Sequence, residues 1–369
     1  MNDYLSKKIK IISFFAIVGV VFCHAYNYYD RFLQSSTFIA EGTVPGAMLQ
    51  FFISNALVRF AVPMFFMFSG YLFFVKFEFS WKGYLKKVLK RVYSLLVPFL
   101  LWTALAGELL YIVYKCVGLE RYSIVYEKIG TALENGVWVW LINSPAFQLW
   151  YLADLFKLVL ISPVIYWLVK KCNLLPVIVF GILWILELFF IINYEGLFFF
   201  TIGAYLAVNK VSIAGMTDLK ESVADKEKYK RVTRILTILW IVGAFSYALL
   251  SATTVPSLSA ACLLMLLYKI NVTTGIFAVW RLYDVNFGKF QNSRFISRLS
   301  TYTVFIFVAH EPLQHLLTDV LLEKMIFNGA HTLVYFGLPM IMILSCVLLG
   351  MAMKKLCPKV YSLMVGGRI

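Results

Sequence analysis

Long apolar runs separated by short polar segments make up most of this chain. Because about 20 apolar residues are needed to cross the hydrocarbon core of a bilayer, the pattern predicts ten spans. They lie at 9–28, 48–75, 92–116, 147–169, 174–192, 196–208, 234–252, 255–270, 301–322 and 332–353. Two of the runs are short, and residues 131–143 could instead form an interfacial or re-entrant helix. The expected fold class is an all-α polytopic membrane protein with about ten transmembrane helices.

Lysine and arginine concentrate in every second segment between these runs. Basic residues precede the first span, fill 76–91 and 170–171, and recur at 210–234, 269–298 and 354–368. Since loops rich in Lys and Arg stay in the cytoplasm, both termini are expected there. The charge run at 217–234 is expected to be a cytoplasmic connector within a single membrane domain covering 1–369.

The composition agrees with a membrane protein and limits the classes of partner that are expected. Hydrophobic residues make up 61% of the chain and charged residues 14%, whereas soluble domains carry about 25% charged residues. The net charge of +15 lies in clusters between apolar runs, which favours orientation in the membrane over binding of nucleic acid. The six cysteines show no CxxC or Cys/His spacing, so neither a metal site nor a disulfide framework is expected.

Polar residues inside the predicted spans are the candidates for function, because each is costly in lipid unless it is paired or lines a wet cavity. His24, near the outer end of the first span, could accept a proton from a hydroxyl at neutral pH. Ser13 precedes it by eleven residues, which puts the two about 20° apart around a helix and about 16 Å apart along it. A groove could therefore follow one face of this helix. The alternative is a histidine that faces lipid headgroups.

The second span carries Arg59 four residues before Pro63, so we expect a kink there. Ser69 and Gly70 follow. Ser69 offers a hydroxyl group, and Gly70 offers a surface on which another helix can approach closely. The alternative is a helix-packing motif with an arginine that reaches towards water.

Each of three further sets of polar or aromatic residues could belong to a site or have a structural role. His310 and Glu311 are adjacent near the middle of the ninth span, so at least one must face protein, in a site or in a structural ion pair. Glu108 and Glu187 could equally form hydrogen bonds between helices. Trp150 and Tyr151 are expected at the outer interface, where aromatic residues gather.

Several chemistries are excluded by missing motifs. The chain has no glycine-rich phosphate loop, no HExxH and no GxSxG. ATP-driven transport and hydrolysis of the soluble type are therefore not expected.

Taken in order, several stretches resemble the acyltransferase-3 family of bacterial integral-membrane O-acyltransferases. The stretches are KIISFFAIVGVVFCHA, SNALVRFAVPMFFMFSGYLFF, YLKKVLKRVYSLLVPFLLW, FQLWYLADLFKLVLISPVI, FFFTIGAYLA, SRLSTYTVFIFVAHEPL and KKLCPKVYSLMVGGR. None is specific alone, but the ordered set covers nearly the whole chain.

The resemblance implies a multi-pass enzyme of the bacterial cell membrane. Such an enzyme would move an acyl group, expected to be acetyl, from cytoplasmic acyl-CoA to a hydroxyl of a cell-surface or lipid-linked glycan. His24 would be the general base, with Arg59 or Ser69 stabilising the oxyanion. The coenzyme is a co-substrate, and no permanently bound cofactor is expected.

The remaining site residues are assigned by the same hypothesis. Lys10, Ser13, Lys87, Lys90 and Arg91 are expected to bind the coenzyme. The residues expected to contact the substrate are Trp150, Tyr151, His310 and Glu311. A homo-oligomer is compatible with the sequence.

Three positions depart from the family pattern. Ser13 stands where a basic residue is usual, Ser94 stands where the second arginine of an RxxR pattern would fall, and Gln148 replaces a histidine. Each departure removes a cationic or titratable group. Two other functions therefore stay open: a transporter or flippase with His24, Arg59, His310 and Glu311 as a proton relay, and an inactive relative that assists surface-polymer assembly.

Overall fold

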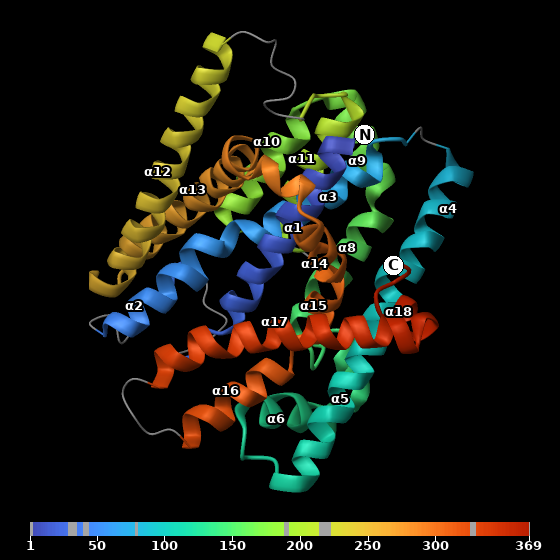
Figure 1. The fold of residues 1–369 in the computed structure, drawn as a ribbon, viewed down its shortest axis with the longest axis vertical. Helices are drawn as coiled ribbons and strands as arrows, with labels where there is room; N and C mark the ends of the chain where they lie inside the picture. The colour runs from blue at the N-terminus through green and yellow to red at the C-terminus, as the bar shows by residue number, and fades with distance from the viewer. Residues whose placement is uncertain are drawn as a thin grey trace. The chain divides into compact units, whose positions relative to one another are not determined.

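The computed structural model describes residues 3–28, 35–39, 44–77, 80–187, 192–213, 223–324 and 330–368. All regular elements in these ranges are helices (Figure 1). The chain forms two compact units, each made of two separate sequence blocks. Unit 1 comprises Met1–Glu78 and Ser162–Ser300, and unit 2 comprises Phe79–Ile161 and Thr301–Ile369.

Unit 1 contains the first helix and the long helical hairpin of α12 and α13, which lie side by side (Figure 1). Its elements are α1 (Asp3–His24), α2 (Pro45–Phe51), the π-helix η1 (Phe52–Ala56), the 3₁₀-helix η2 (Leu57–Phe60), α3 (Ala61–Phe74), α9 (Ser162–Cys172), α10 (Leu175–Leu186), α11 (Tyr194–Val208), α12 (Val223–Thr253), α13 (Leu258–Leu282), the π-helix η8 (Tyr283–Phe287), the 3₁₀-helix η9 (Gly288–Asn292) and α14 (Arg294–Leu299).

Side-chain caps explain where two of these helices begin. Asn193 accepts hydrogen bonds from the backbone N–H groups of Glu195 and Gly196 at the start of α11. Ser257 accepts one from Ala260 N at the start of α13. Each cap satisfies donors that have no partner within the helix, so polar residues between apolar runs fix the ends of the helices.

The second predicted span is continuous from Pro45 to Phe74 but irregular in its middle. A π-helical turn and a 3₁₀ turn lie between α2 and α3, and α3 begins two residues before Pro63. Because proline has no N–H and its ring clashes with the carbonyl four residues earlier, the regular α-helix is not carried back through Arg59. The backbone is therefore irregular at Arg59, where a kink was expected, and the kink itself stays a prediction.

Glycines allow α3 and α11 to cross at very close range. A β-carbon at Gly70 would collide with the carbonyl oxygen of Phe200, and one at Gly203 would collide with that of Met67. Only glycine permits two backbones to approach this closely. Gly70 is therefore a helix-packing residue.

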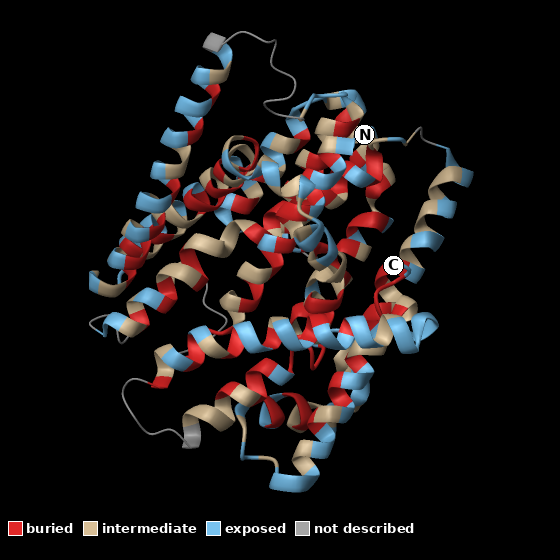
Figure 2. Ribbon diagram, viewed as in Figure 1, coloured by how far each residue is buried: buried red, intermediate tan, exposed pale blue. Residues whose placement is uncertain are grey.

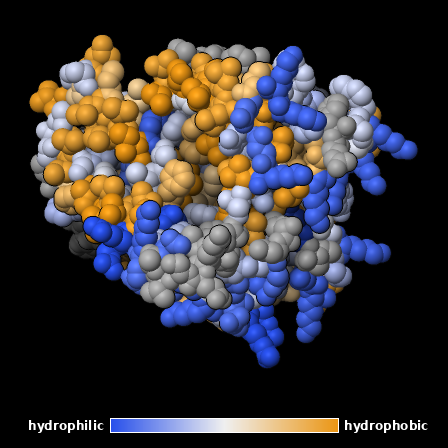
Figure 3. Space-filling view, turned by 90° about the horizontal axis from the view of Figure 1, so that it is seen from above, coloured by the Kyte–Doolittle hydropathy of each residue, from blue (hydrophilic) through white to orange (hydrophobic). Residues whose placement is uncertain are grey.

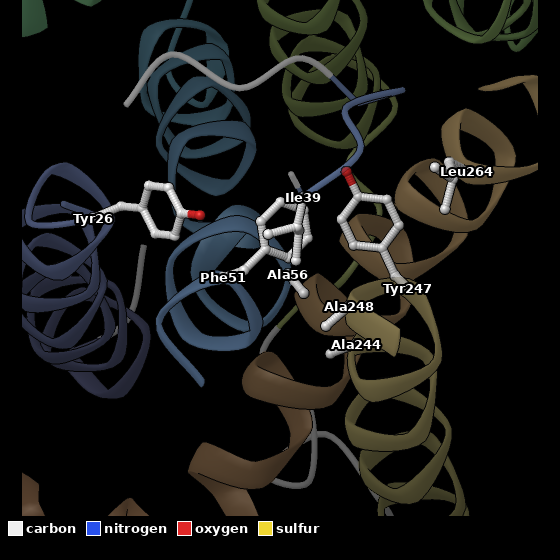
Figure 4. Packing of buried hydrophobic residues seen from close by; sticks show 8 residues of the cluster. All are labelled: Tyr26, Ile39, Phe51, Ala56, Ala244, Tyr247, Ala248 and Leu264. Carbon is white, nitrogen blue, oxygen red and sulfur yellow. The ribbon is translucent and has the colours of Figure 1, made fainter. Parts of the chain in front are cut away.

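A hydrophobic cluster joins Tyr26 and Ile39 of unit 1 to α12 and α13. Tyr26, Phe51, Tyr247 and Leu264 pack together with Ile39 and three alanines (Figure 4). The Tyr247 hydroxyl donates to Ser35 O at 3.0 Å, and Ile39 N donates to Ser251 O at 2.9 Å. Residues 35–39 are therefore fixed against α12 by both packing and hydrogen bonds.

Unit 2 contains α4 (Trp81–Arg91), the π-helix η3 (Val92–Leu96), α5 (Val97–Val117), α6 (Ser123–Val125), the π-helix η4 (Tyr126–Gly130), α7 (Thr131–Asn135), the 3₁₀-helices η5 (Val137–Leu141) and η6 (Phe147–Leu149), α8 (Trp150–Leu160), α15 (Thr303–Ala309), α16 (Leu313–Lys324), α17 (Ala330–Leu356) and α18 (Pro358–Met364). The segment predicted as interfacial or re-entrant, 131–143, forms two short helices separated by Gly136, whose φ is 81°.

Five helices in the described ranges are long and apolar enough to cross a membrane. They are Pro45–Phe74, Trp81–Val117, Asp225–Thr253, Leu258–Asn292 and Ala330–Leu356, and a sixth span results if the consecutive helices Phe147–Leu160 and Ser162–Cys172 act as one. Further apolar helices are short: Leu175–Leu186, Tyr194–Val208 and Leu313–Leu322. The structure therefore supports five or six spans. The remaining spans of the predicted ten, and the cytoplasmic location of both termini, stay predictions.

Two predicted segments differ from the structure. The ninth span, 301–322, is divided into α15 and α16 by a break at 310–312. The connector 217–234 is helical from Val223, where α12 begins, and its residues 217–222 lie outside the described residues. Since charged side chains such as those of 225–234 have good helix propensity, the long helix starts well before its apolar part.

The surface supports a membrane location. Apolar side chains cover large areas of the face in Figure 3, and α12 carries exposed residues along its length (Figure 2). Ile238, Leu239, Val242 and Phe245 on this helix are each more than half exposed. Contiguous exposed apolar surface is unfavourable in water and is satisfied by lipid chains.

Candidate active site

The first helix ends at His24, the predicted general base. Ser54 Oγ donates to Phe22 O at 2.8 Å, and Asn27 N donates to Gln50 Oε1 at 3.2 Å. These bonds tie the last turn of α1 to α2 and η1 in the second span. The half-buried His24 side chain therefore extends from a fixed backbone.

Ser13 and His24 lie on one helix, as the sequence predicts, and both are half-buried. Ile17 and Val20 lie between them on nearly the same face and are 0% and 5% exposed. This face of α1 is thus packed against protein between the two polar residues.

Arg59 lies beside the last turn of α1. Its guanidinium donates to Asn55 Oδ1, and it interacts electrostatically with Cys23, the residue before His24, and with Glu195. The structure therefore places the predicted base and the predicted oxyanion-stabilising cation at the same end of unit 1.

Ser69 does not belong to this group. It follows Arg59 by ten residues along η2 and α3, which separates their backbones by about 15 Å. Its neighbour Gly70 contacts α11. Of the two residues suggested for the oxyanion, only Arg59 lies near the end of α1.

A cluster of charged residues near Arg59 was not predicted from the sequence. Lys269 Nζ lies 2.8 Å from Glu187 Oε1 and 4.8 Å from the centre of the Trp184 ring. Ser35 Oγ donates to the same Glu187 oxygen at 2.6 Å. Glu195, in the first turn of α11, interacts electrostatically with both Lys269 and Arg59.

This cluster changes two interpretations. Glu187, which had no assigned partner, forms an ion pair at the left-handed end of α10, where its φ is 49°. The prediction that Lys269 opens a basic loop is wrong, because Lys269 lies in the middle of α13 and is 6% exposed. Two cations and two carboxylates balance each other here, and of the closest pair Lys269 is buried while the Glu187 side chain is 43% exposed.

A second buried network holds the start of α1. Lys8 Nζ lies 2.7 Å from Asp284 Oδ1 and 3.8 Å from the centre of the Trp280 ring. The hydroxyls of Tyr4 and Tyr229 also donate to Asp284, at 2.5 and 2.6 Å. Lys8 is thus a structural residue of unit 1 and not only a topology signal. Lys10, predicted to bind the coenzyme, is exposed.

Unit 1 also contains an apolar cavity of about 540 Å³. It is lined by Ile12, Phe15, Phe60, Trp240, Val279, Leu282, Tyr283, Phe287 and Phe290. Ile12 and Phe15 point roughly 130° away from Ser13 around the helix. The cavity therefore lies off the face that carries Ser13 and His24, and its lining suits a hydrocarbon chain better than the phosphates of a coenzyme.

In unit 2, local hydrogen bonds hold His310 and Glu311 at the break between α15 and α16. Both side chains are buried, at 0% and 1% exposure. His310 Nδ1 lies 2.9 Å from Ile306 O, and Glu311 Oε2 accepts from His315 N at 3.2 Å in the first turn of α16. These contacts fix the orientation of the break, while a role for the pair towards substrate stays a prediction.

Gln148, at the usual position of a histidine, connects this break to α8. Its Nε2 donates to Val308 O at 3.2 Å and lies 3.4 Å from Glu311 O. Because an amide is not titratable, Gln148 can hold the break in place through these hydrogen bonds but cannot accept a proton.

The two aromatic residues predicted to contact substrate differ in their surroundings. Trp150 is 38% exposed. Tyr151 packs edge-on against Phe307, with ring centroids 5.7 Å apart, and interacts electrostatically with Arg91. The structure thus brings Tyr151 to a residue that was assigned to the coenzyme.

The basic residues of α4 also differ in their exposure and in their neighbours. Lys90 is exposed, whereas Lys87 is half-buried and repelled by Arg91 one turn later. Arg91 is in turn close to Arg368 near the end of the chain. A cluster of three cations, Lys87, Arg91 and Arg368, therefore forms in unit 2.

A serine, a histidine and an aspartate also meet in unit 2. Ser123 Oγ lies 3.5 Å from His315 Nε2, and Asp319 Oδ2 lies 3.7 Å from the same nitrogen. A nucleophile relay needs the carboxylate on the opposite ring nitrogen. This group therefore does not have the geometry of a serine nucleophile.

The chain belongs to the acyltransferase-3 family, whose acyltransferase-domain model matches residues 8–350 of the 369. The match extends over both units. No curated protein and no solved structure matches the chain significantly. The fold and the family together define a membrane acyltransferase.

Proposed function

We propose that the protein transfers an acyl group, expected to be acetyl, from acyl-CoA to a hydroxyl of a cell-surface or lipid-linked glycan. The observation that carries the proposal is the placement of His24 and Arg59 at one end of unit 1 in a chain of this family. The reaction supplies a role for each. Histidine can accept a proton near neutral pH, and arginine is a permanent cation.

His24 would accept the proton of the acceptor hydroxyl as the oxygen attacks the thioester carbonyl carbon. The negative charge that develops on the carbonyl oxygen would be stabilised by the Arg59 guanidinium, which Asn55 orients. The carbon–sulfur bond then breaks, and the proton passes from His24 to the departing thiolate. No covalent enzyme intermediate is needed, in keeping with the geometry around Ser123.

The test is acyl transfer from isotope-labelled acetyl-CoA by the full-length protein in membrane vesicles. His24→Ala should lower the rate by about 10²- to 10⁴-fold, the usual contribution of a general base. His331→Ala is the matched control, because it removes a histidine from the start of α17 in unit 2. Normal transfer by a properly inserted His24→Ala variant would contradict the assignment.

The same vesicles also test the alternative function, that of a transporter. The charges of Arg59, Lys269, Glu187 and Glu195 could also serve a proton-coupled carrier. Solute or lipid-linked sugar movement that depends on His24, with no acyl transfer, would favour that reading.

A further inference from the structure

The apolar cavity of unit 1 is enclosed by side chains from four parts of the unit. Ile12 and Phe15 come from α1, Phe60 comes from η2 and Trp240 comes from α12, while α13, η8 and η9 supply the remaining lining residues. The cavity volume of about 540 Å³ lies within the range of ligand-binding sites, about 300–1,000 Å³. The space is therefore large enough to hold a ligand.

Contacts between aromatic rings hold the walls of the cavity in place. Phe290 stacks on both Phe15 and Phe287, with ring centroids 6.1 and 5.5 Å apart. Phe60 packs edge-on against Trp240, with centroids 5.4 Å apart. These pairs, in geometries that aromatic rings prefer, join α1 to η9 and η2 to α12. The cavity is therefore built by the fold of unit 1.

The lining determines which kind of molecule can occupy the cavity. It is almost wholly apolar, whereas a buried water molecule needs two to four polar partners. An empty cavity is unfavourable too, because its lining atoms lose packing contacts. Since an apolar cavity of about 150 Å³ holds one benzene molecule, this one has room for roughly 20 carbon atoms. That is enough for one acyl chain of a phospholipid.

The cavity opens at the surface of unit 1 among apolar residues. Phe15 and Phe287 line it and are 47% and 42% exposed. Val242, nearby on α12, is 55% exposed, as suits a surface covered by lipid chains. Lys289, two residues after Phe287, is exposed as well and puts a cation near the opening, where a headgroup phosphate can meet it. A chain can therefore enter directly from the bilayer.

The position of the cavity along α1 distinguishes between possible lipids. Ile12 and Phe15 lie in the first half of α1, and His24 is nine residues beyond Phe15, about 13 Å further along the helix. A lipid-linked glycan would have to present its hydroxyl at His24, at the opposite end. An acetyl donor has no chain that could fill the space. These observations favour a lipid of the leaflet at the start of α1.

We infer that the cavity binds one acyl chain of a membrane phospholipid, which fills the space between α1, α12 and α13. The positive-inside pattern predicts that this phospholipid belongs to the cytoplasmic leaflet. The inference goes beyond the proposed function, because it assigns a lipid site away from His24 that takes no part in acyl transfer.

Trp240 provides a direct test from inside the cavity. It is only 9% exposed, and its indole lies on the backbone of Gly275, where a β-carbon would come within 2.7 Å of Nε1. The full-length protein would be reconstituted in nanodiscs of phosphatidylcholine with brominated acyl chains, which quench tryptophan fluorescence on contact. Comparison with Trp240→Phe and Trp167→Phe gives the quenching of each residue. Trp167, 55% exposed on α9, is the control that the surrounding lipid reaches.

We expect both tryptophans to be quenched. Quenching of Trp167 without quenching of Trp240 would overturn the inference. This measurement leaves the valine and phenylalanine residues of the cavity unchanged, so it decides the question even if a cavity-filling variant does not fold.

A pair of matched variants then tests the cavity itself. Val279→Phe fills part of it, and Val242→Phe makes the same change on the exposed surface of α12. Native mass spectrometry counts the phospholipid that is retained after purification in detergent. Val279→Phe should retain about a tenth as much as the wild type and lose the quenching of Trp240, because the added ring takes the place of several methylene groups. Val242→Phe should match the wild type.

Two outcomes of this comparison would contradict the inference. One is equal lipid retention by the two folded variants. The other is a retained molecule with the mass of a polyprenyl lipid in place of a phospholipid. Because neither experiment involves coenzyme A or a glycan, the lipid site stands or falls separately from acyl transfer.

Discussion

At the scale of single residues, the two units treat buried charge differently. Lys8 faces Asp284, and Lys269 faces Glu187, so the charges of unit 1 are compensated within the fold. At Arg91 and Arg368 of unit 2, two guanidinium groups repel each other.

One prediction follows for Arg368. Burial and, secondly, the Arg91 charge lower the pKa of Arg368 in the folded protein to about 10, so the cost of this charge is fully present below pH 10 and is relieved as the group loses its proton at higher pH. Arg368→Gln should therefore raise the melting temperature of the protein at pH 7, by about 1–3 °C. The gain should shrink above pH 10. A melting temperature that falls, as for a structural cation, would contradict this result.

The opposite effect is expected at Lys8. Lys8→Ala leaves the Asp284 carboxylate buried without its cation, which should destabilise the protein by about 3–5 kcal/mol. Lys7→Ala is the control, because Lys7 forms an exposed ion pair with Asp3 and such pairs contribute about 0–1 kcal/mol. Thermal unfolding in detergent measures both. Equal stability of the two variants would show that the Lys8 network is not structural.

The sequence could reveal residues that are polar against an apolar background, and only those. His24 and Arg59 were found because each lies inside an apolar run. Lys8 and Lys269 were missed, since a lysine near the end of a run also reads as an orientation signal. The contact of the Gly366 turn with Ser94 was missed because the two residues lie far apart in the chain.

At the scale of elements, the regular helices are interrupted at the candidate residues. The second span contains π and 3₁₀ turns next to Arg59, and α15 ends before His310. Such interruptions are frequent at functional sites. Pro63 indicated the interruption at Arg59. The interruption before His310 could not be located from hydropathy, because hydropathy is averaged over a window of residues.

The crossing of α3 and α11 gives a test at this scale. Gly70→Ala should destabilise the protein by about 1–3 kcal/mol, because the added methyl group would collide with the Phe200 carbonyl. Gly337→Ala, inside α17 with open space around it, should be neutral or stabilising, since alanine favours the helix. Unfolding temperatures of the purified variants measure the difference. A Gly70→Ala variant as stable as Gly337→Ala would contradict the close crossing.

At the scale of the whole molecule, the chain alternates between its two units. Unit 1 takes the residues before and after the segment 79–161, as far as Ser300, and unit 2 takes that segment together with the C-terminal part of the chain. A single sequence predicted helices and a membrane location because these follow from composition and periodicity. The grouping into units depends on contacts between distant segments, which the apolar pattern does not encode.

The predicted topology can be tested with the chain's own cysteines. Cys116 and Cys357 are both exposed free thiols. The positive-inside pattern puts Cys116 at the outer end of the third span and Cys357 in the cytoplasm. In variants that retain one of the two, a membrane-impermeant maleimide should label Cys116 in intact cells and Cys357 only after permeabilisation. The reverse labelling pattern would contradict cytoplasmic termini.

The central claim is that His24 drives transfer of an acyl group to a surface glycan, and its most direct test is the mass of that glycan. Glycans would be compared from cells that express the wild-type protein, the His24→Ala variant at equal membrane abundance, or no protein. We predict that an acyl mass increment is present only with the wild type and that it identifies the acyl chain. Glycans of identical mass in all three strains, or an increment that persists with His24→Ala, would contradict the account.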